Sequence, residues 1–223
     1  MVLQVEPRRE YICSTGLVLH LPLYDMDGGI FKTKDSYGHQ ATVNGALWRL
    51  GGRYFDGVDD KIDCGNASPL DITGNITVEV WFKQETGGAV VPDLLGKATD
   101  YTGYGIETNT TNRVVHFRTG HSGTAWDTSP SYVVSPGSFY HIVGVYDGSY
   151  LRLYVNGVEI TPATVFSSGL PTNAATVKLG VHYSGDPGIG AFKGDIGEAR
   201  IYNRALTPLE IQLNYLRTKW RYQ

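Results

Sequence analysis

Cysteine is scarce in this sequence of 223 residues, which contains only Cys13 and Cys64. One pair of cysteines cannot supply the dense disulfide framework of small secreted domains, so the fold must depend on a hydrophobic core. The pair is compatible with one disulfide between the N-terminus and a later strand, or with two separate thiols that pack as small apolar groups. We treat the two cysteines as unpaired.

The sequence also lacks long hydrophobic runs and an excess of positive charge. No segment approaches the roughly 20 apolar residues of a membrane span, and residues 1–10 lack the uninterrupted apolar stretch of a signal peptide. We therefore expect no membrane insertion. The formal net charge of −3 provides no basic field for DNA or RNA, so nucleic acid is not an expected partner.

What the sequence does contain is the pattern of β-strands, most clearly between Phe139 and Gly157. Two short segments with a side-chain period of two lie on either side of Asp147-Gly148, and Asn156-Gly157 follows the second segment. Glycine, and to a lesser degree aspartate, tolerates the positive φ that tight turns demand. This stretch therefore predicts a β-hairpin.

Five further segments are short, rich in β-forming residues and bounded by turn-forming residues. They are residues 17–21, 76–82, 113–117, 176–180 and 199–202. The 28 glycines and 10 prolines supply many turns, and no linker-like stretch or internal repeat divides the chain, which predicts a single all-β domain. Trp48 and Trp81 lie within strand patterns, and we expect both in the core.

Helical periodicity is found at the C-terminus. Thr207-Pro208-Leu209-Glu210 places a hydroxyl at the N-cap, a proline at N1 and a carboxylate at N3, which is the pattern of a capping box. Leucine or tryptophan then recurs at helical spacing, at positions 209, 213, 216 and 220. We expect one amphipathic helix whose apolar stripe packs on the outer face or edge of the β domain. In an assembly, the same stripe could contact a neighbouring molecule.

Several motifs occur in the order that is typical of one family. They are Gly16 to Leu23, Asp35-Ser36-Tyr37-Gly38, Phe55 to Asp60, Thr77 to Phe82, the hairpin, and Gly194 to Leu206 with its Arg-Ile-Tyr-Asn-Arg-Ala-Leu run. Over residues 16–216, the chain thus resembles the laminin G-like, concanavalin A-like jelly-roll domains. The resemblance implies an antiparallel two-sheet β-sandwich with one short C-terminal helix. Residues 1–15 form an N-terminal arm in this interpretation, and residues 16–223 form the jelly-roll domain.

The resemblance does not give a reaction, because family members serve as glycan-binding modules, adhesion domains, appendages of enzymes and parts of virus particles. Glycosidases that share the sandwich place their carboxylates in a Glu-x-Asp-x-x-Glu pattern on one strand. Here Glu79 is followed by Trp81 and Lys83 on its own face. No Ser-His-Asp, Cys-His or His-x-x-x-His signature is legible either. We therefore expect that the protein is not an enzyme.

The resemblance also implies a calcium site as a candidate cofactor site. Relatives use the Asp-Ser-x-Gly turn, here at Asp35, and an acidic pair that here reads Gly197-Glu198. Calcium prefers about six to eight oxygen ligands, so the loss of one carboxylate weakens such a site. Asp35 and Glu198 are candidate ligands on this basis. The alternatives are a turn-forming role for Asp35 and an ion pair between Glu198 and Arg200 or Arg204.

Aromatic residues are frequent, at 12% of the sequence, and several lie in expected loops or on polar strand faces. An aromatic ring stacks on the apolar face of a sugar, while short polar side chains bond its hydroxyls. The stretches from Thr99 to Ser131 and from Val181 to Pro187 have this character. The candidate ligand-binding residues are Tyr101, Tyr104, His121, Trp126, Tyr132, Tyr183 and Asp186.

Two functions from different classes remain open. The first is a non-catalytic recognition or adhesion module that binds a glycan or a cell-surface polymer, with calcium as a candidate aid. The second is a structural component of a virus particle, such as a capsid decoration or a tail or fibre protein, that docks on capsid or tail neighbours. The segment from Asn214 to Tyr222 resembles the ends of such phage proteins. Both functions predict an extracellular or virion-surface location and are compatible with a homo-oligomer.

Overall fold

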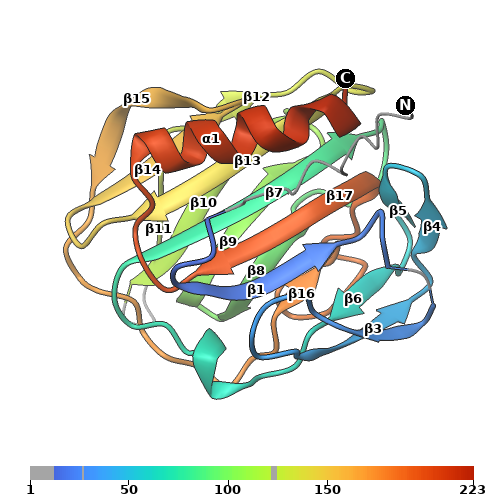
Figure 1. Ribbon diagram of the computed structural model, residues 1–223, viewed down its shortest axis with the longest axis horizontal. Coiled ribbons are helices and arrows are strands. Elements are labelled where there is room, and N and C mark those ends of the chain that lie inside the picture. The colour runs from blue at the N-terminus through green and yellow to red at the C-terminus, as the bar shows by residue number, and fades with distance from the viewer. Residues whose placement is uncertain (1–12, 27, 122–124) are drawn as a thin grey trace, which may run out of the picture.

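The computed structural model describes residues 13–26, 28–121 and 125–223. In this part of the chain, two antiparallel β-sheets pack face to face, and one α-helix lies across the outer face of the first sheet (Figure 1). The predicted all-β jelly-roll sandwich with a short C-terminal helix is confirmed. The predicted N-terminal arm, residues 1–15, lies almost entirely outside the described residues.

The sheet that carries the helix is called sheet A. Its strands run in the order β15-β14-β13-β7-β17-β5-β4, and β1 pairs with β17. The bounds are β1 Leu17–Pro22, β4 Leu47–Arg49, β5 Gly52–Asp56, β7 Ile76–Gln84, β13 Phe139–Tyr146, β14 Tyr150–Val155, β15 Val158–Val165 and β17 Lys193–Tyr202. The predicted hairpin is confirmed as β13 and β14, in which Tyr146 pairs with Leu151 across the turn.

The second sheet, sheet B, runs in the order β11-β10-β9-β8-β16-β6-β3-β2, and β12 pairs with β10. The bounds are β2 Ile30–Lys32, β3 Gln40–Asn44, β6 Lys61–Asp63, β8 Asp93–Thr99, β9 Thr102–Asn109, β10 Val114–His121, β11 Ala125–Thr128, β12 Tyr132–Val133 and β16 Lys178–Leu179. Two short 3₁₀ turns complete the described elements, η1 Ser68–Leu70 and η2 Lys219–Arg221. Within the described residues, the α-helix lies on sheet A and not on the outer face of sheet B.

The core lies between the two sheets and is built from apolar side chains that alternate along the strands. Phe117 of β10 points inward and fills the space opposite Gly144 of β13. A Cβ on Gly144 would lie 2.3 Å from Phe117 Cγ, so only glycine allows this close approach of the sheets. Cys13 and Cys64 are free thiols, as expected.

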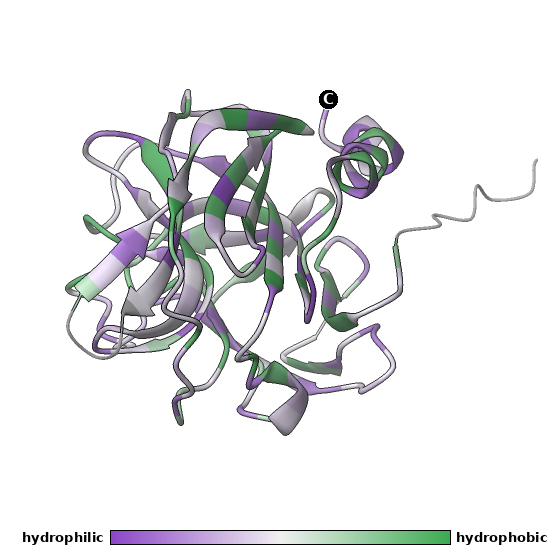
Figure 2. Cartoon of the chain, turned by 90° about the vertical axis from the view of Figure 1, so that its left-hand side faces the viewer, coloured by the Kyte–Doolittle hydropathy of each residue, from purple (hydrophilic) through white to green (hydrophobic). Residues whose placement is uncertain are grey.

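The helix α1, Pro208–Thr218, begins with the predicted capping box. The Thr207 side chain accepts a hydrogen bond from the Glu210 backbone, and the Glu210 carboxylate accepts one from the Thr207 backbone. Together these bonds satisfy two backbone N–H groups at the helix start, which stabilises the helix end by about 1 kcal/mol. Figure 2 views α1 nearly end-on beside the strands.

The face that α1 presents to sheet A differs from our prediction. The residues predicted to pack on the sheet are between 36% and 63% exposed, and they are Leu209, Leu213, Leu216 and Trp220. The buried positions are instead Ile211, Asn214 and Thr218. The reason is that the outer face of sheet A carries charged side chains beneath the helix, and buried polar groups require hydrogen-bonding partners, which leucine cannot supply.

The two tryptophans expected in the core also occupy different environments. Trp48 lies on the edge strand β4 and is 44% exposed, so its prediction as a core residue is wrong. Trp81 is 2% exposed, but it lies between sheet A and the C-terminal segment, where it donates to Thr218 Oγ1 and stacks on Tyr222. Within the described residues, we find no helix with the length and apolar character needed to cross a membrane.

Candidate functional site

Three of the predicted ligand-binding residues lie together on the outer face of sheet B. The ring centroid of Trp126 lies 6.0 Å from that of Tyr101 and 5.6 Å from that of Tyr183. Tyr101 is 43% exposed, and the other two rings are half-buried. We call Tyr101, Trp126 and Tyr183 the aromatic platform. Their role in ligand binding stays a prediction.

The backbone brings these rings together from three separate segments. Tyr101 lies in the two-residue turn between β8 and β9. Its backbone φ is 53°, a value that residues other than glycine rarely adopt. Trp126 of β11 pairs with Gly120 of β10. A Cβ on Gly120 would lie 2.3 Å from Tyr101 O, so glycine at this position allows the turn to fold onto the sheet. Tyr183 comes from the loop between β16 and β17.

A buried arginine supports the platform from below. The guanidinium carbon of Arg118 lies 4.0 Å from the Trp126 ring centroid and 5.0 Å from that of Tyr183. Its Nη2 donates to both carboxylate oxygens of Asp93, at 2.7 and 2.8 Å, and its Nε lies 3.3 Å from Glu107. Burial alone would lower the pKa of Arg118, but the carboxylates of Asp93 and Glu107 raise it by more than burial lowers it. The net pKa is therefore above its usual value, and the guanidinium stays charged beneath the rings.

Glu107 and His116 lie side by side on β9 and β10 next to this arginine. Glu107 Oε1 is 3.5 Å from His116 Nε2, and both side chains are largely buried. Burial raises the pKa of Glu107 to about 7, against the attraction of Arg118. Burial and Arg118 together lower the pKa of His116 to about 4. The environment therefore favours the uncharged forms of both groups.

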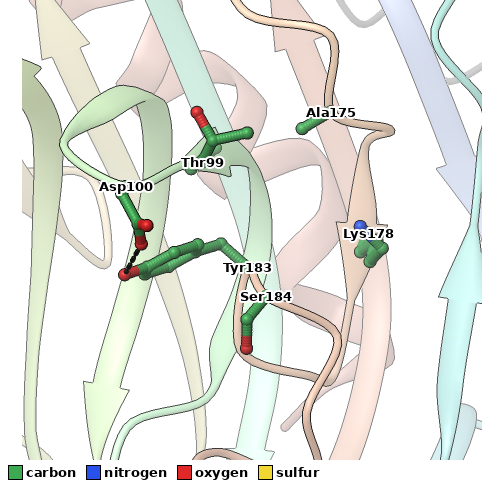
Figure 3. A pocket seen from close by; sticks show the side chains of 7 residues that line it. Thr99, Asp100, Ala175, Lys178, Tyr183 and Ser184 are labelled. Carbon is green, nitrogen blue, oxygen red and sulfur yellow. Dashed lines mark hydrogen bonds between the residues drawn. The ribbon is translucent and has the colours of Figure 1, made fainter. Parts of the chain in front are cut away.

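A polar pocket of about 330 Å³ opens beside the platform. Figure 3 shows Thr99 and Asp100 on one side, Lys178 on the other, and Tyr183 and Ser184 between them. The Tyr183 hydroxyl donates to Asp100 Oδ1 at 3.1 Å, which fixes the ring at the border between pocket and platform. The pocket thus offers hydroxyls, a carboxylate and an amine directly beside exposed aromatic surface.

Tyr104 does not belong to this site, and its expected exposure is wrong. It is 2% exposed, and its hydroxyl donates to Leu70 O at 3.0 Å inside the sandwich. Along β9, Tyr104 shares the inward face with Ile106, whereas Gly105 and Glu107 lie on the outward face. Tyr132 also lies away from the platform, because its half-buried ring packs against the core and lies 6.1 Å from the ring of Tyr140.

The last two predicted residues flank the site without a described contact to the rings. His121 ends β10 opposite Ala125, and its side chain lies outside the described part of the structure. Asp186 is exposed, and its Oδ1 accepts a hydrogen bond from Gly188 N at 2.8 Å. Asp186 therefore shapes the loop that carries Tyr183, and a direct ligand contact by either residue stays a prediction.

Sequence reasoning missed the polar members of the site. Arg118, Asp100 and Lys178 carry the charges around the platform, yet none was predicted. The signal for Asp100 was its position next to Tyr101. Arg118 alternates with Phe117 on β10, which places it on the outward face, but its contact with Trp126 depends on strand pairing that the sequence alone does not give.

The candidate calcium ligands have other partners in the structure. Asp35 Oδ1 accepts the backbone N–H groups two and three residues later, and Oδ2 accepts that of His20 at 3.0 Å. Glu198 accepts from His20 Nε2 at 2.8 Å and pairs with Arg200. A carboxylate held by a guanidinium or by several N–H groups does not fit a calcium ligand. Both structural alternatives for these acids are therefore present, and calcium binding stays a prediction without support from these contacts.

Three other acids approach each other at the end of β5 and in the turn that follows it. Oxygens of Asp56, Asp59 and Asp60 lie within 4.8 Å of one another. Asp60 Oδ2 already accepts the Asp56 backbone N–H at 2.8 Å, and the Asp60 side chain packs against Gly45, where a Cβ would lie 1.7 Å from its Oδ1. These contacts account for the cluster as a hydrogen-bonded acidic turn.

The charged residues on the outer face of sheet A form a closed structural cluster. Burial would raise the pKa of Glu79, but the adjacent Arg200 and hydrogen bonds from His141 and Asn214 bring it down to about 2. Asn214 of α1 donates to Glu79 Oε2 at 2.9 Å and thereby joins the helix to the sheet. Glu79 is 1% exposed, so this carboxylate is not open to a ligand.

Comparison with known families agrees with this architecture. A family model described as the concanavalin A-like lectin/glucanases superfamily matches residues 56–212. The chain belongs to this superfamily. No curated protein sequence matches the chain. Among solved structures, the botulinum neurotoxin serotype D ligand-binding domain in complex with N-acetylneuraminic acid has a TM-score of 0.74 at 13% identity, over 91% of this chain and 51% of that structure.

Two further structures show the same fold. The Trypanosoma rangeli sialidase in complex with sialic acid has a TM-score of 0.67 at 19% identity, over 92% of this chain and 33% of the sialidase chain. The binding domain of botulinum neurotoxin DC in complex with rat synaptotagmin II has a TM-score of 0.66 at 10% identity, over 90% and 51%. The superfamily member described here thus spans about half of the toxin domains and a third of the sialidase chain, and at these identities the likeness concerns the fold.

Proposed function

We propose that this domain is a non-catalytic carbohydrate-binding module that recognises glycans with the aromatic platform on sheet B. The observation that carries the proposal is the convergence of Tyr101, Trp126 and Tyr183 from three chain segments, next to a polar pocket. Stacked rings bind the apolar faces of sugars, and neighbouring hydroxyls and carboxylates bond the sugar hydroxyls. Thr99, Asp100 and Ser184 supply such groups within the pocket.

The backbone of the turn also supports a binding role. Tyr101 adopts a positive φ that costs a non-glycine residue of order 1 kcal/mol or more, and such outliers concentrate at functional sites. A smaller residue such as glycine would relieve this cost, but it would remove the most exposed ring of the platform. The presence of tyrosine in this conformation therefore supports a role for the Tyr101 ring in ligand contact.

The structural neighbours support carbohydrate as the ligand class. Two of the structures that share the fold contain N-acetylneuraminic acid or sialic acid, according to their descriptions. A third is bound to a protein, synaptotagmin II, so the fold also serves protein recognition. We infer a glycan ligand for this chain because its candidate site is built from rings and short polar groups. On this proposal, the module acts outside the cell or on the surface of a particle.

The structural-component function is a second candidate because one observation favours it. The apolar stripe of α1 and η2 (Leu209, Leu213, Leu216 and Trp220) is exposed, as a surface for protein neighbours requires. As a capsid, tail or fibre component, the purified domain is expected to associate through this stripe and to show no saturable glycan binding.

A glycan array followed by calorimetric titration tests the proposal. The wild-type domain is expected to bind a subset of glycans with saturation, and Trp126→Ala is expected to reduce this affinity at least tenfold because the central ring is lost. Trp220→Ala is the matched control, since Trp220 is an exposed tryptophan in η2, which follows the helix that lies on sheet A. A flat array, or equal binding by the Trp126→Ala and wild-type domains, would refute the proposal.

A further inference from the structure

The amine of Lys178 distinguishes the pocket beside the platform from an ordinary sugar-stacking surface. Lys178 is half-buried in β16, yet its ammonium forms no ion pair or hydrogen bond with any of the described residues. Lys97 Nζ lies 2.8 Å from Asp71, and Lys83 Nζ lies 2.6 Å from Asp195. The half-buried Lys61 and Lys193 also have no such partner among the described residues, but of these three lysines only Lys178 lines the pocket. An unpaired ammonium in a partly desolvated pocket gains more from an anionic partner than one in open water.

The nearest acid across the strands does not serve as that partner. Asp63 of β6 pairs in register with Lys178, but its Oδ1 accepts Gly65 N at 2.8 Å and its Oδ2 accepts the Thr176 hydroxyl at 2.9 Å. On the other side, Lys178 pairs with Gly96, which presents no side chain. Neither strand neighbour thus pairs with the Lys178 amine, and the Lys178 side chain lines the pocket.

The other charge in the pocket is already oriented. Asp100 Oδ1 accepts the Tyr183 hydroxyl at 3.1 Å, and Asp100 lies on the side of the pocket away from Lys178 (Figure 3). A ligand that fills the pocket thus meets a hydrogen-bond acceptor at one side and a cation at the other. Ala98 and Ala175 keep the space between them free of bulky side chains.

We propose that this pocket takes the anionic substituent of an acidic sugar, a carboxylate or a sulfate, through Lys178. The inference rests on the proposed glycan-binding function and specifies its ligand class. The sugar ring stacks on the aromatic platform, its hydroxyls bond to Asp100 and Ser184, and its anionic group pairs with the Lys178 ammonium. A simple inorganic anion satisfies only the last contact, so an acidic sugar is the ligand that fits both ends of the site.

The experiment compares matched ligands and matched variants by calorimetric titration. The ligands are hyaluronan oligosaccharides, the same oligosaccharides after carboxyl reduction, sialylated oligosaccharides with their unsialylated cores, dextran sulfate and neutral dextran. These pairs separate a carboxylate from a sulfate ester and from uncharged sugar. The wild-type domain is expected to bind at least one anionic ligand about tenfold more tightly than its neutral counterpart, with an affinity that falls as salt rises.

The variants then locate the cause. Lys178→Met is expected to remove the tenfold preference for the anionic member of each pair, and Lys178→Arg is expected to restore it. Lys34→Met, at an exposed position beyond the pocket, is the control for net charge. Trp126→Ala is expected to weaken anionic and neutral ligands alike. Melting temperatures within a few degrees of the wild type show that each variant is folded.

The outcomes separate the two proposals. If the wild type binds neutral and anionic members of every pair equally, or if Lys178→Met keeps the preference, the inference about Lys178 is overturned while the glycan-binding function stands. If no glycan binds, or if Trp126→Ala has no effect on any ligand, the proposed function itself fails, and the inference fails with it.

Discussion

The guanidinium carbon of Arg118 lies 4.0 Å from the ring centroid of Trp126, while its Nη2 donates to both oxygens of Asp93. The ring thus rests on a cation that is itself fixed to β8. A cation held beneath an aromatic face is worth about 0.5–2 kcal/mol, and here it also restricts where the ring can lie. The buried ion pair is therefore a support for the platform, in addition to a structural contact between two strands.

Replacement of this arginine by lysine tests the support. Arg118→Lys keeps the charge but loses the planar group that stacks on Trp126, so we expect glycan affinity to fall about fivefold to tenfold. We also expect the free energy of unfolding to fall by about 1–3 kcal/mol, because the buried Asp93 carboxylate then accepts fewer hydrogen bonds than it does from arginine. Titration calorimetry and chemical denaturation measure the two effects.

The control for the arginine variant is Arg152→Lys. Arg152 pairs with Asp147 and Glu159 on sheet A and is partly exposed, so its replacement is expected to leave glycan binding unchanged and to cost less than about 1 kcal/mol. Unaltered glycan affinity in Arg118→Lys, at wild-type stability, would show that the platform does not need its support.

Gly120 offers an independent test of the platform from the backbone. In Gly120→Ala, the new Cβ would lie 2.3 Å from Tyr101 O, so the β8–β9 turn must move away from β10. We expect glycan affinity to fall at least tenfold, with NMR shift changes concentrated around Tyr101 and Trp126. Gly74→Ala is the control, because a Cβ there has no neighbour within 4 Å. Shifts confined to residue 120, with full binding, would contradict the expected displacement.

Most of the fold could be predicted because its signals are local. The hairpin of β13 and β14 follows from side-chain alternation around Asp147-Gly148, and the start of α1 follows from the Thr207 to Glu210 capping box. Each signal depends on residues that are neighbours in the sequence. The order of the strands in the two sheets depends on distant pairings, and it entered through the family resemblance.

The side chains of the site were harder to predict because exposure depends on which face of a strand meets the core. Tyr101 and Tyr104 are three residues apart in a similar local sequence. The Tyr104 ring is nevertheless buried, with its hydroxyl bonded to Leu70 O, whereas the Tyr101 ring is exposed. A shift of one residue reverses inside and outside along a strand. The same limit applies to α1, where the stripe of leucines suggested the packed face, but the charged surface of sheet A selected Asn214 and Thr218.

The neighbours Glu107 and His116 predict a specific dependence of stability on pH. Glu107 has an ordinary pKa of 4.5 and a folded value of about 7, so the folded state binds more protons between these values and stability falls as pH rises. His116 has an ordinary pKa of 6.5 and a folded value of about 4, so the unfolded state binds more protons and stability rises with pH. The two slopes oppose each other between about pH 4.5 and 6.5.

Removing one partner should therefore reveal the slope of the other. In His116→Gln, we expect the free energy of unfolding to fall by about 3 kcal/mol as pH rises from 4.5 to 7, because the unfolded chain releases the Glu107 proton while the folded state keeps it. Glu107→Gln is the matched control, with the opposite slope between pH 4 and 6.5. Denaturation at fixed pH values measures both, and parallel curves for the two variants would show that these groups are not desolvated as the structure indicates.

The contact between Asn214 and Glu79 makes a final prediction about the helix. Asn214 Nδ2 donates to Glu79 Oε2 at 2.9 Å and to the Tyr202 hydroxyl at 3.1 Å, and both acceptors are buried under α1. In Asn214→Ala these acceptors lose a donor without access to water, so we expect the free energy of unfolding to fall by about 2 kcal/mol. Leu216→Ala, two residues along the same helix, is the control.

The control variant separates the two faces of α1. Leu216 is 47% exposed on the apolar stripe, so its replacement by alanine is expected to change the free energy of unfolding by no more than about 0.5 kcal/mol. Urea denaturation of dilute protein measures both variants. If Leu216→Ala were the more damaging change, the leucine stripe would have to be packed in solution. The polar face of the helix would then not be its attachment to sheet A.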